Sequence, residues 1–153
     1  MVFDGEELLE FAIKSIRNVI DYISVTYQDI SYFGNEADSS LKETLFRLKD
    51  QKLIDDLIFY KTDFSISPKE NELNLRNLGL QYSRNNGCTH HISSDVDEFY
   101  KDFELKKVFN LIKDQNYDFT FVKQEIYYKD PTWLISPNQE MYVTFIHPVE
   151  NEY

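Results

Sequence analysis

Two carboxylates two positions apart are the leading candidates for chemistry in this chain: Asp95 and Asp97, in the segment Asp-Val-Asp-Glu. On an extended segment, side chains two apart point the same way, so we expect both carboxylates to converge on one ion. Carboxylate oxygens suit Mg²⁺ or Mn²⁺, and these ions keep open positions for substrate phosphates. The alternative is a solvated acidic turn that caps the next helix, and in so acidic a chain the spacing alone does not distinguish the two.

The elements around this segment alternate between helical and extended periodicity. The strongest helix signal is Ser67-Pro68-Lys69-Glu70, which offers an N-cap serine, a proline at the first helical position and a capping-box glutamate. The apolar spacing predicts four helices, which include residues 9–20, 41–48, 68–85 and 105–112, and extended segments at 22–27, 57–60, 88–94, 117–128 and 141–146.

This order predicts a single α/β domain over residues 1–153, with a mostly parallel sheet and helices on both faces. In such sheets ligands bind beyond the carboxyl ends of the strands. We therefore expect the site in the loops after Tyr27, Tyr60 and Ser94. Only Met1–Phe3 precede the first expected helix. Either the first strand of the domain is very short or it has been lost, and we favour loss.

Composition limits the partners. The chain has 16 basic and 27 acidic residues, a net charge of -11, which repels nucleic-acid phosphate, so we expect no nucleic acid as a partner. No apolar run approaches the roughly 20 residues of a membrane helix, and the N-terminal residues do not have the basic-then-apolar pattern of a secretion leader, so we expect none. A single cysteine, Cys88, fits a reducing compartment, and we expect the cytoplasm of a bacterium or of a virus-infected host cell.

A resemblance extends over about the first two thirds of the chain. Arg76-Asn77-Leu78-Gly79, followed by Gly87–Phe99 with its Asp-Val-Asp, resembles the R-N-x-G … D-x-D block of family 2-like GT-A glycosyltransferases, in particular small viral and bacterial ones. The resemblance implies the GT-A fold, which is Rossmann-like, and the transfer of a sugar from a nucleotide-diphosphate donor with inversion. Family members usually continue into an acceptor-binding half, which we expect to be absent from a chain that ends at Tyr153.

The resemblance also implies roles for individual residues. Asp95 and Asp97 match the carboxylates that bind Mn²⁺ or Mg²⁺, and Arg76 and Asn77 match the pair that helps to fix the diphosphate. Three further residues match positions where the family contacts uracil and ribose: Gln28, Asp29 and Ser31. Asp63, which follows the third strand, is a weaker candidate for the base pocket. An aspartate at position 29 can accept from the N3–H of a pyrimidine, which predicts UDP- or dTDP-sugar donors.

Two further residues have competing interpretations. No residue matches the base that deprotonates the acceptor hydroxyl; Asp130 is a candidate, but a turn-forming role before Pro131 is the alternative. His147 is a candidate to approach the metal from the last strand. The sequence thus predicts a metal-dependent glycosyltransferase acting on a glycan or other hydroxyl acceptor. The alternatives are a nucleotide-sugar-binding remnant without activity, or an interaction domain whose acidic turn is structural.

Overall fold

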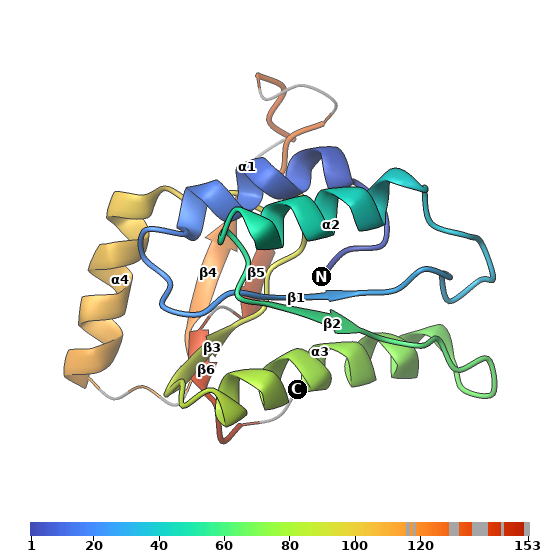
Figure 1. Ribbon diagram of the computed structural model, residues 1–153. Helices are drawn as coiled ribbons and strands as arrows, with labels where there is room; N and C mark the ends of the chain where they lie inside the picture. Colours follow the sequence, from blue (N-terminus) through green and yellow to red (C-terminus); the bar gives the residue numbers. More distant parts are fainter. Residues whose placement is uncertain (116, 118, 129–131, 136–140, 145, 152–153) are drawn as a thin grey trace.

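The computed structural model describes residues 1–115, 117, 119–128, 132–135, 141–144 and 146–151 (Figure 1). The predicted alternation of helices and strands is confirmed up to the fourth helix. The helices are α1 (Glu6–Ile16), α2 (Ser40–Asp50), α3 (Pro68–Asn85) and α4 (Asp102–Gln115). The strands are β1 (Ser24–Tyr27), β2 (Asp56–Phe59), β3 (His90–Ile92), β4 (Phe121–Gln124), β5 (Met141–Thr144) and β6 (Ile146–Pro148). None of the described helices is both long and apolar enough to cross a membrane.

The centre of the molecule has three layers, and helices cover both faces of the sheet as the sequence predicts. The strands β1 and β2 pair in parallel, with Val25 opposite Leu57, while α1 and α2 lie on one face and α3 on the other (Figure 1). The apolar stripes of α1 and α2 close over these strands because leucine and isoleucine recur at helical spacing. The most deeply buried residues of this core are Leu41, Leu45, Leu48 and Ile54.

The prediction of a mostly parallel sheet is wrong for the described strands. Only β1 and β2 pair in parallel as strands, whereas β3 pairs with β6 and β4 with β5 in antiparallel register. Parallel neighbours require a long crossover, usually a helix, and no helix is described between β4 and β6. The last third of the chain therefore folds back on the domain instead of extending the parallel sheet.

The expected first strand is present as a single paired residue. Val2 forms an isolated parallel bridge with Tyr27, and its amide donates to the carbonyl of Thr26 at 3.0 Å. The nitrogen of Met1 donates to the carbonyl of Ser94 at 2.8 Å. The first two residues thus connect β1 with the segment that follows β3.

The start of α3 is the one predicted in most detail, and it is confirmed. The hydroxyl of Ser67 accepts from the amide of Glu70, and the Glu70 carboxylate accepts from the amide of Ser67 at 2.9 Å. Pro68 occupies the first turn, where its missing amide would have had no partner within the helix. This capping box fixes where α3 begins, and therefore which of its side chains face the sheet.

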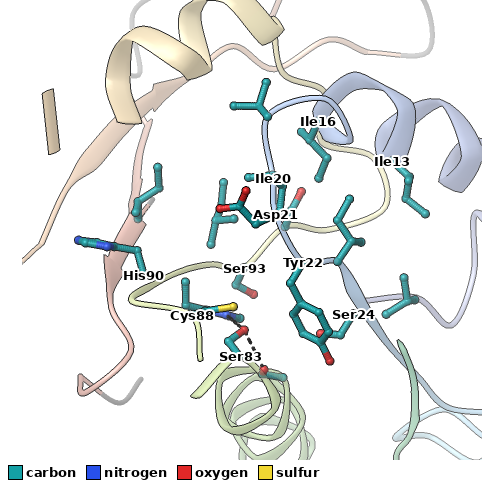
Figure 2. Close-up of a pocket in the computed structure, with 18 of the residues that line it drawn as sticks. Ile13, Ile16, Ile20, Asp21, Tyr22, Ser24, Ser83, Cys88, His90 and Ser93 are labelled. Atoms are coloured by element: carbon teal, nitrogen blue, oxygen red, sulfur yellow. Dashed lines mark hydrogen bonds between the residues drawn. The ribbon is translucent and has the colours of Figure 1, made fainter. Parts of the chain in front are cut away.

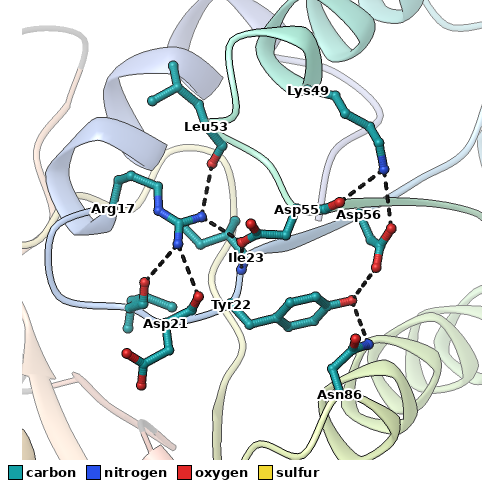
Figure 3. Close-up of polar contacts among 10 residues, drawn as sticks. Arg17, Asp21, Tyr22, Ile23, Lys49, Leu53, Asp55, Asp56 and Asn86 are labelled. Atoms are coloured by element: carbon teal, nitrogen blue, oxygen red, sulfur yellow. Dashed lines mark hydrogen bonds and ion pairs between the residues drawn. The ribbon is translucent and has the colours of Figure 1, made fainter.

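A polar network joins the layers at the amino ends of β1 and β2 (Figure 3). Arg17 donates to the Asp55 carboxylate at 2.6 Å, and the same carboxylate accepts from the amide of Ile23 at 2.7 Å. Tyr22 donates to Asp56 at 2.8 Å, and Tyr22 and Lys49 lower the pKa of that carboxyl. The network fixes the amino ends of these strands, and the ligand is expected at their carboxyl ends.

Candidate functional site

The loops after β1, β2 and β3 lie at one end of the sheet, as the sequence predicts. The hydroxyl of Thr62, after β2, donates to the carbonyl of Ile30, after β1, at 2.6 Å. Arg76 of α3 donates to the Ser93 hydroxyl, after β3, at 3.0 Å. Burial raises the pKa of Tyr32 to about 12, and the charges of Glu72 and Asp95 contribute to this rise. The loop after β1 thus carries a partly buried tyrosine whose pKa responds to the acidic segment that follows β3.

The segment Asp95–Glu98 is a turn and not an extended strand, so the predicted local geometry is wrong. The amide of Glu98 donates to the carbonyl of Asp95 at 3.2 Å, and the Glu98 carboxylate accepts from the amide of Asp95 at 3.3 Å. Val96, between the two aspartates, packs against the main core. The Val96 side chain also packs closely against Gly5: a Cβ atom added to Gly5 would lie only 3.2 Å from Cγ1 of Val96. The core contact of Val96 therefore fixes the turn that carries both aspartates.

The Asp95 carboxylate has one paired oxygen and one unpaired oxygen. Oδ2 lies 3.4 Å from a guanidinium nitrogen of Arg76, which also pairs with Glu72 at 2.9 Å. Oδ1 is buried and has no hydrogen-bond partner among the described residues. A buried carboxylate oxygen without a donor is costly, and a bound cation would remove that cost.

Asp97 lies on the same turn and is exposed to solvent. Burial lowers the pKa of the Met1 amino group, whereas the charges of Asp95, Glu98 and Asp97 raise it. Glu98 is engaged in structure, because its carboxylate also accepts from the Tyr100 hydroxyl at 3.0 Å. Asp97 is thus the most solvent-exposed carboxylate of this turn.

These two aspartates would not complete a coordination shell on their own. The described residues contain no group of three or more histidine, cysteine or acidic side chains that could hold a metal ion. Mg²⁺ and Mn²⁺ sites in nucleotide-dependent enzymes commonly take one or two carboxylates and fill the other positions with water and phosphate oxygens. A cation at this turn would therefore need further ligands, such as water or phosphate oxygens.

His147, the candidate ligand on the last strand, lies on β6 directly opposite His91. The two ring centres are 5.8 Å apart, and His147 is buried. The structure thus pairs His147 with His91 across β3 and β6, and its approach to a metal stays a prediction.

The residues predicted to contact the nucleoside lie after β1, in two environments. Gln28 is buried, and its Oε1 has no hydrogen-bond partner among the described residues. Asp29 is half-buried and pairs with Lys42 of α2 at 3.1 Å. The hydroxyl of Ser31 accepts from the amide of Asn35 at 3.0 Å and so shapes the loop. Gln28 and Asp29 are thus the two residues here with acceptors that a ligand could use.

Two other predicted contacts lie apart from the carboxylates or have a structural role. Asp63 accepts from the amide and hydroxyl of Ser65 at 2.8 and 2.6 Å, and these bonds lower its pKa. Asn77 lies in a shallow depression with Gln81 on α3, separate from the cavity lined by its neighbour Arg76. Of the predicted pair, Arg76 contacts Asp95 through its guanidinium. Asp130, the candidate base, lies outside the described residues.

Two residues of this region were missing from the sequence-based prediction. Glu72 shares the guanidinium of Arg76 with Asp95, and its position four residues before Arg76 on a helix is a signal that would have found it. The charges of Glu72 and Asp95 raise the pKa of Tyr32, and no local pattern in the sequence marks this residue. Comparison of the chain with protein-family models, with curated proteins and with solved structures finds no match.

Proposed function

We propose that this protein binds a nucleotide-diphosphate sugar through a divalent cation held by Asp95 and Asp97, and transfers the sugar to a hydroxyl acceptor. The observation that carries the proposal is the unpaired, buried Oδ1 of Asp95, in a turn at the ligand-binding end of the sheet. The resemblance of Arg76-Asn77 and Asp95-Val96-Asp97 to the GT-A block supports the same function and a GT-A-like fold.

Arg76 would act as a positioning residue in this site. Its guanidinium holds Asp95 on one side and Glu72 on the other, and its side chain is only 23% exposed. This contact orients the Asp95 carboxylate before a ligand arrives, which lowers the ordering cost of binding. A cation bound there would neutralise charge on the diphosphate leaving group. The chain's net charge of -11 makes such local compensation necessary for an anionic ligand.

The proposed activity is tested by the release of nucleoside diphosphate from a panel of nucleotide sugars. With Mn²⁺ present, we expect release of UDP or dTDP above background from at least one sugar donor, and loss of that release with a chelator. Binding of UDP without release from any donor would instead identify a binding module that lacks transfer activity. Release that persists in chelator would contradict the metal-dependent mechanism.

The nucleoside end of the site yields a second prediction. Asp29 pairs with Lys42 on the surface, and an exposed pair of this kind contributes little, so the carboxylate can exchange Lys42 for a pyrimidine N3–H. Replacing Asp29 with alanine is expected to weaken UDP binding by about 5- to 150-fold, the equivalent of about 1–3 kcal/mol for a hydrogen bond that the ligand buries. Glu36→Ala, an exposed acidic position in the same loop, is the matched control.

The measurement is the dissociation constant of UDP and of GDP with Mn²⁺ for the parent chain and both variants. We expect the parent chain to prefer UDP and the Glu36 variant to behave like it. A preference for GDP, or normal UDP binding by Asp29→Ala, would remove Asp29 from the nucleoside site and leave the metal site standing.

A further inference from the structure

The chain that follows β4 forms an antiparallel hairpin whose large side chains are exposed. The amide of Tyr128 donates to the carbonyl of Trp133 at 2.9 Å, and the amide of Ile135 donates to the carbonyl of Ile126 at 2.8 Å. The hairpin projects beyond α1 (Figure 1). It therefore presents these side chains outside the core of the domain.

One face of the hairpin carries two aromatic rings. Residues directly opposite each other in an antiparallel pair lie on the same face, and neighbours along one strand lie on opposite faces. Tyr128 and Trp133 are such an opposite pair, whereas the bridge between Tyr127 and Leu134 belongs to the other face. Tyr128 is 54% exposed and Trp133 is 62% exposed. We call these two rings the aromatic platform.

The hairpin begins beside the acidic turn. Nε2 of Gln124, the last residue of β4, donates to Oε1 of Glu98 at 3.4 Å. Glu98 closes the turn that carries Asp95 and Asp97. Tyr128 follows Gln124 by four residues, and an extended chain spans at most about 3.6 Å per residue, so their backbones are within about 14 Å of each other. The aromatic platform thus lies close to the proposed sugar-donor site.

Ring chemistry and charge together favour a neutral carbohydrate on the aromatic platform. Tyrosine and tryptophan combine a flat apolar ring with a hydroxyl or N–H group, which suits a sugar ring with a C–H face and a rim of hydroxyls. Nucleic-acid bases also stack on aromatic rings, but they require a basic groove for the phosphates. The net charge of -11 disfavours nucleic acid and an anionic membrane surface alike.

A cavity of about 950 Å³ between β1 and β3 suits a sugar less well (Figure 2). Ile13, Ile16 and Ile20 line it, and branched aliphatic side chains offer no flat ring for stacking. Tyr22 also lines it, but its hydroxyl is engaged with Asp56 at 2.8 Å. The exposed hairpin is therefore the better surface for a carbohydrate.

We infer that Tyr128 and Trp133 bind the acceptor of the transfer reaction, and that this acceptor is a neutral glycan with a pyranose ring that stacks on the aromatic platform. The inference rests on the proposed function, which supplies the donor sugar at Asp95 and Asp97. In the transfer, a glycan hydroxyl oxygen bonds to the anomeric carbon of the donor. The bond from that carbon to the diphosphate breaks, the nucleoside diphosphate leaves with the electron pair, and the hydroxyl proton is released.

Trp133 is the single tryptophan of the chain, so its fluorescence reports directly on the aromatic platform. The probes are cellotriose, maltotriose and tri-N-acetylchitotriose, each titrated without metal or nucleotide. We expect a saturable fluorescence change with at least one of them. Tyr128→Ala is expected to weaken that binding by about 5- to 150-fold, as for the loss of a ring that stacks on a base. Phe46→Ala, which removes an exposed ring on α2, is the matched control and should bind normally.

Two further variants separate this inference from the proposed nucleotide site. Asp97→Ala should bind the oligosaccharide like the parent chain, and calorimetry should show that Trp133→Phe keeps binding that Trp133→Ala loses. No response to any of the three probes, or equal affinity in Tyr128→Ala, would overturn the aromatic platform. Self-association that shields Trp133 would overturn it too, by assigning the hairpin to a second copy of the chain. Binding of UDP with Mn²⁺ is measured separately: UDP binding without oligosaccharide binding removes the platform alone, and the reverse result contradicts the acceptor role.

Discussion

Replacing Asp97 with alanine is expected to weaken Mn²⁺-dependent binding of UDP by about 100-fold or more. Asp97 is an exposed carboxylate on the turn that holds Asp95, and its removal leaves a single aspartate for the cation. Even groups that only support a metal ligand contribute about 10- to 100-fold to metal affinity, so loss of a ligand should cost at least as much. The measurement is the dissociation constant of UDP with Mn²⁺ for parent and variant.

Two companion variants make this result specific. Asp50→Ala removes an exposed aspartate at the end of α2 and should bind UDP normally, which controls for the change in net charge. Asp95→Ala should lose UDP binding as well. In this variant Arg76 keeps its ion pair with Glu72 but loses the one with Asp95. Unchanged binding in both the Asp95 and the Asp97 variants would assign the turn a structural role only.

The free energy of unfolding is expected to fall by about 3 kcal/mol as the pH drops from about 6.5 to about 4, because of His91 alone. Burial lowers the pKa of His91 from 6.5 to about 4, and the charges of His147 and Arg84 act in the same direction. Between these values the unfolded chain binds a proton that the folded chain excludes, so stability decreases as the pH falls through this window. The shift converts at about 1.4 kcal/mol per pH unit.

Urea unfolding at several pH values between 4 and 7 tests this expectation. In the His91→Gln variant the slope of stability against pH should become nearly flat above pH 5, whereas His90→Gln should keep the parent slope. His90 is the matched control because neighbouring side chains on a strand point to opposite sides, and the ring of His91 faces Ser83 at 2.8 Å. Equal slopes for the two variants would contradict the role assigned to burial of His91.

Local signals in the sequence predicted the helices well because their causes are local. The capping box at Ser67 and Glu70 and the leucine stripe of α2 depend on residues within one or two turns of each other. Strand pairing depends on contacts distant in the chain, such as His91 with His147, and no nearby residue encodes that choice. The parallel sheet was therefore predicted too broadly, although the order of elements was right.

The acidic site shows the same division between local and distant causes. The residue types of Asp95 and Asp97 and their place after a strand could be predicted from sequence. Their arrangement on a turn depends on the packing of Val96 against the distant core. The hydrogen bond from the Asp95 amide to Glu98 has the three-residue spacing of a capping box, and that signal predicted the turn better than the extended interpretation did.

The central claim is that Asp95 and Asp97 bind a cation together with a nucleotide diphosphate. Calorimetric titration of UDP into the full chain, once with Mn²⁺ and once with a chelator, tests it most directly. We predict saturable one-site binding with Mn²⁺, no measurable binding with the chelator, and binding by Asp97→Ala in Mn²⁺ that is weaker by about 100-fold or more. Equal binding of UDP with and without Mn²⁺, or no binding of UDP in the presence of Mn²⁺, would contradict the claim.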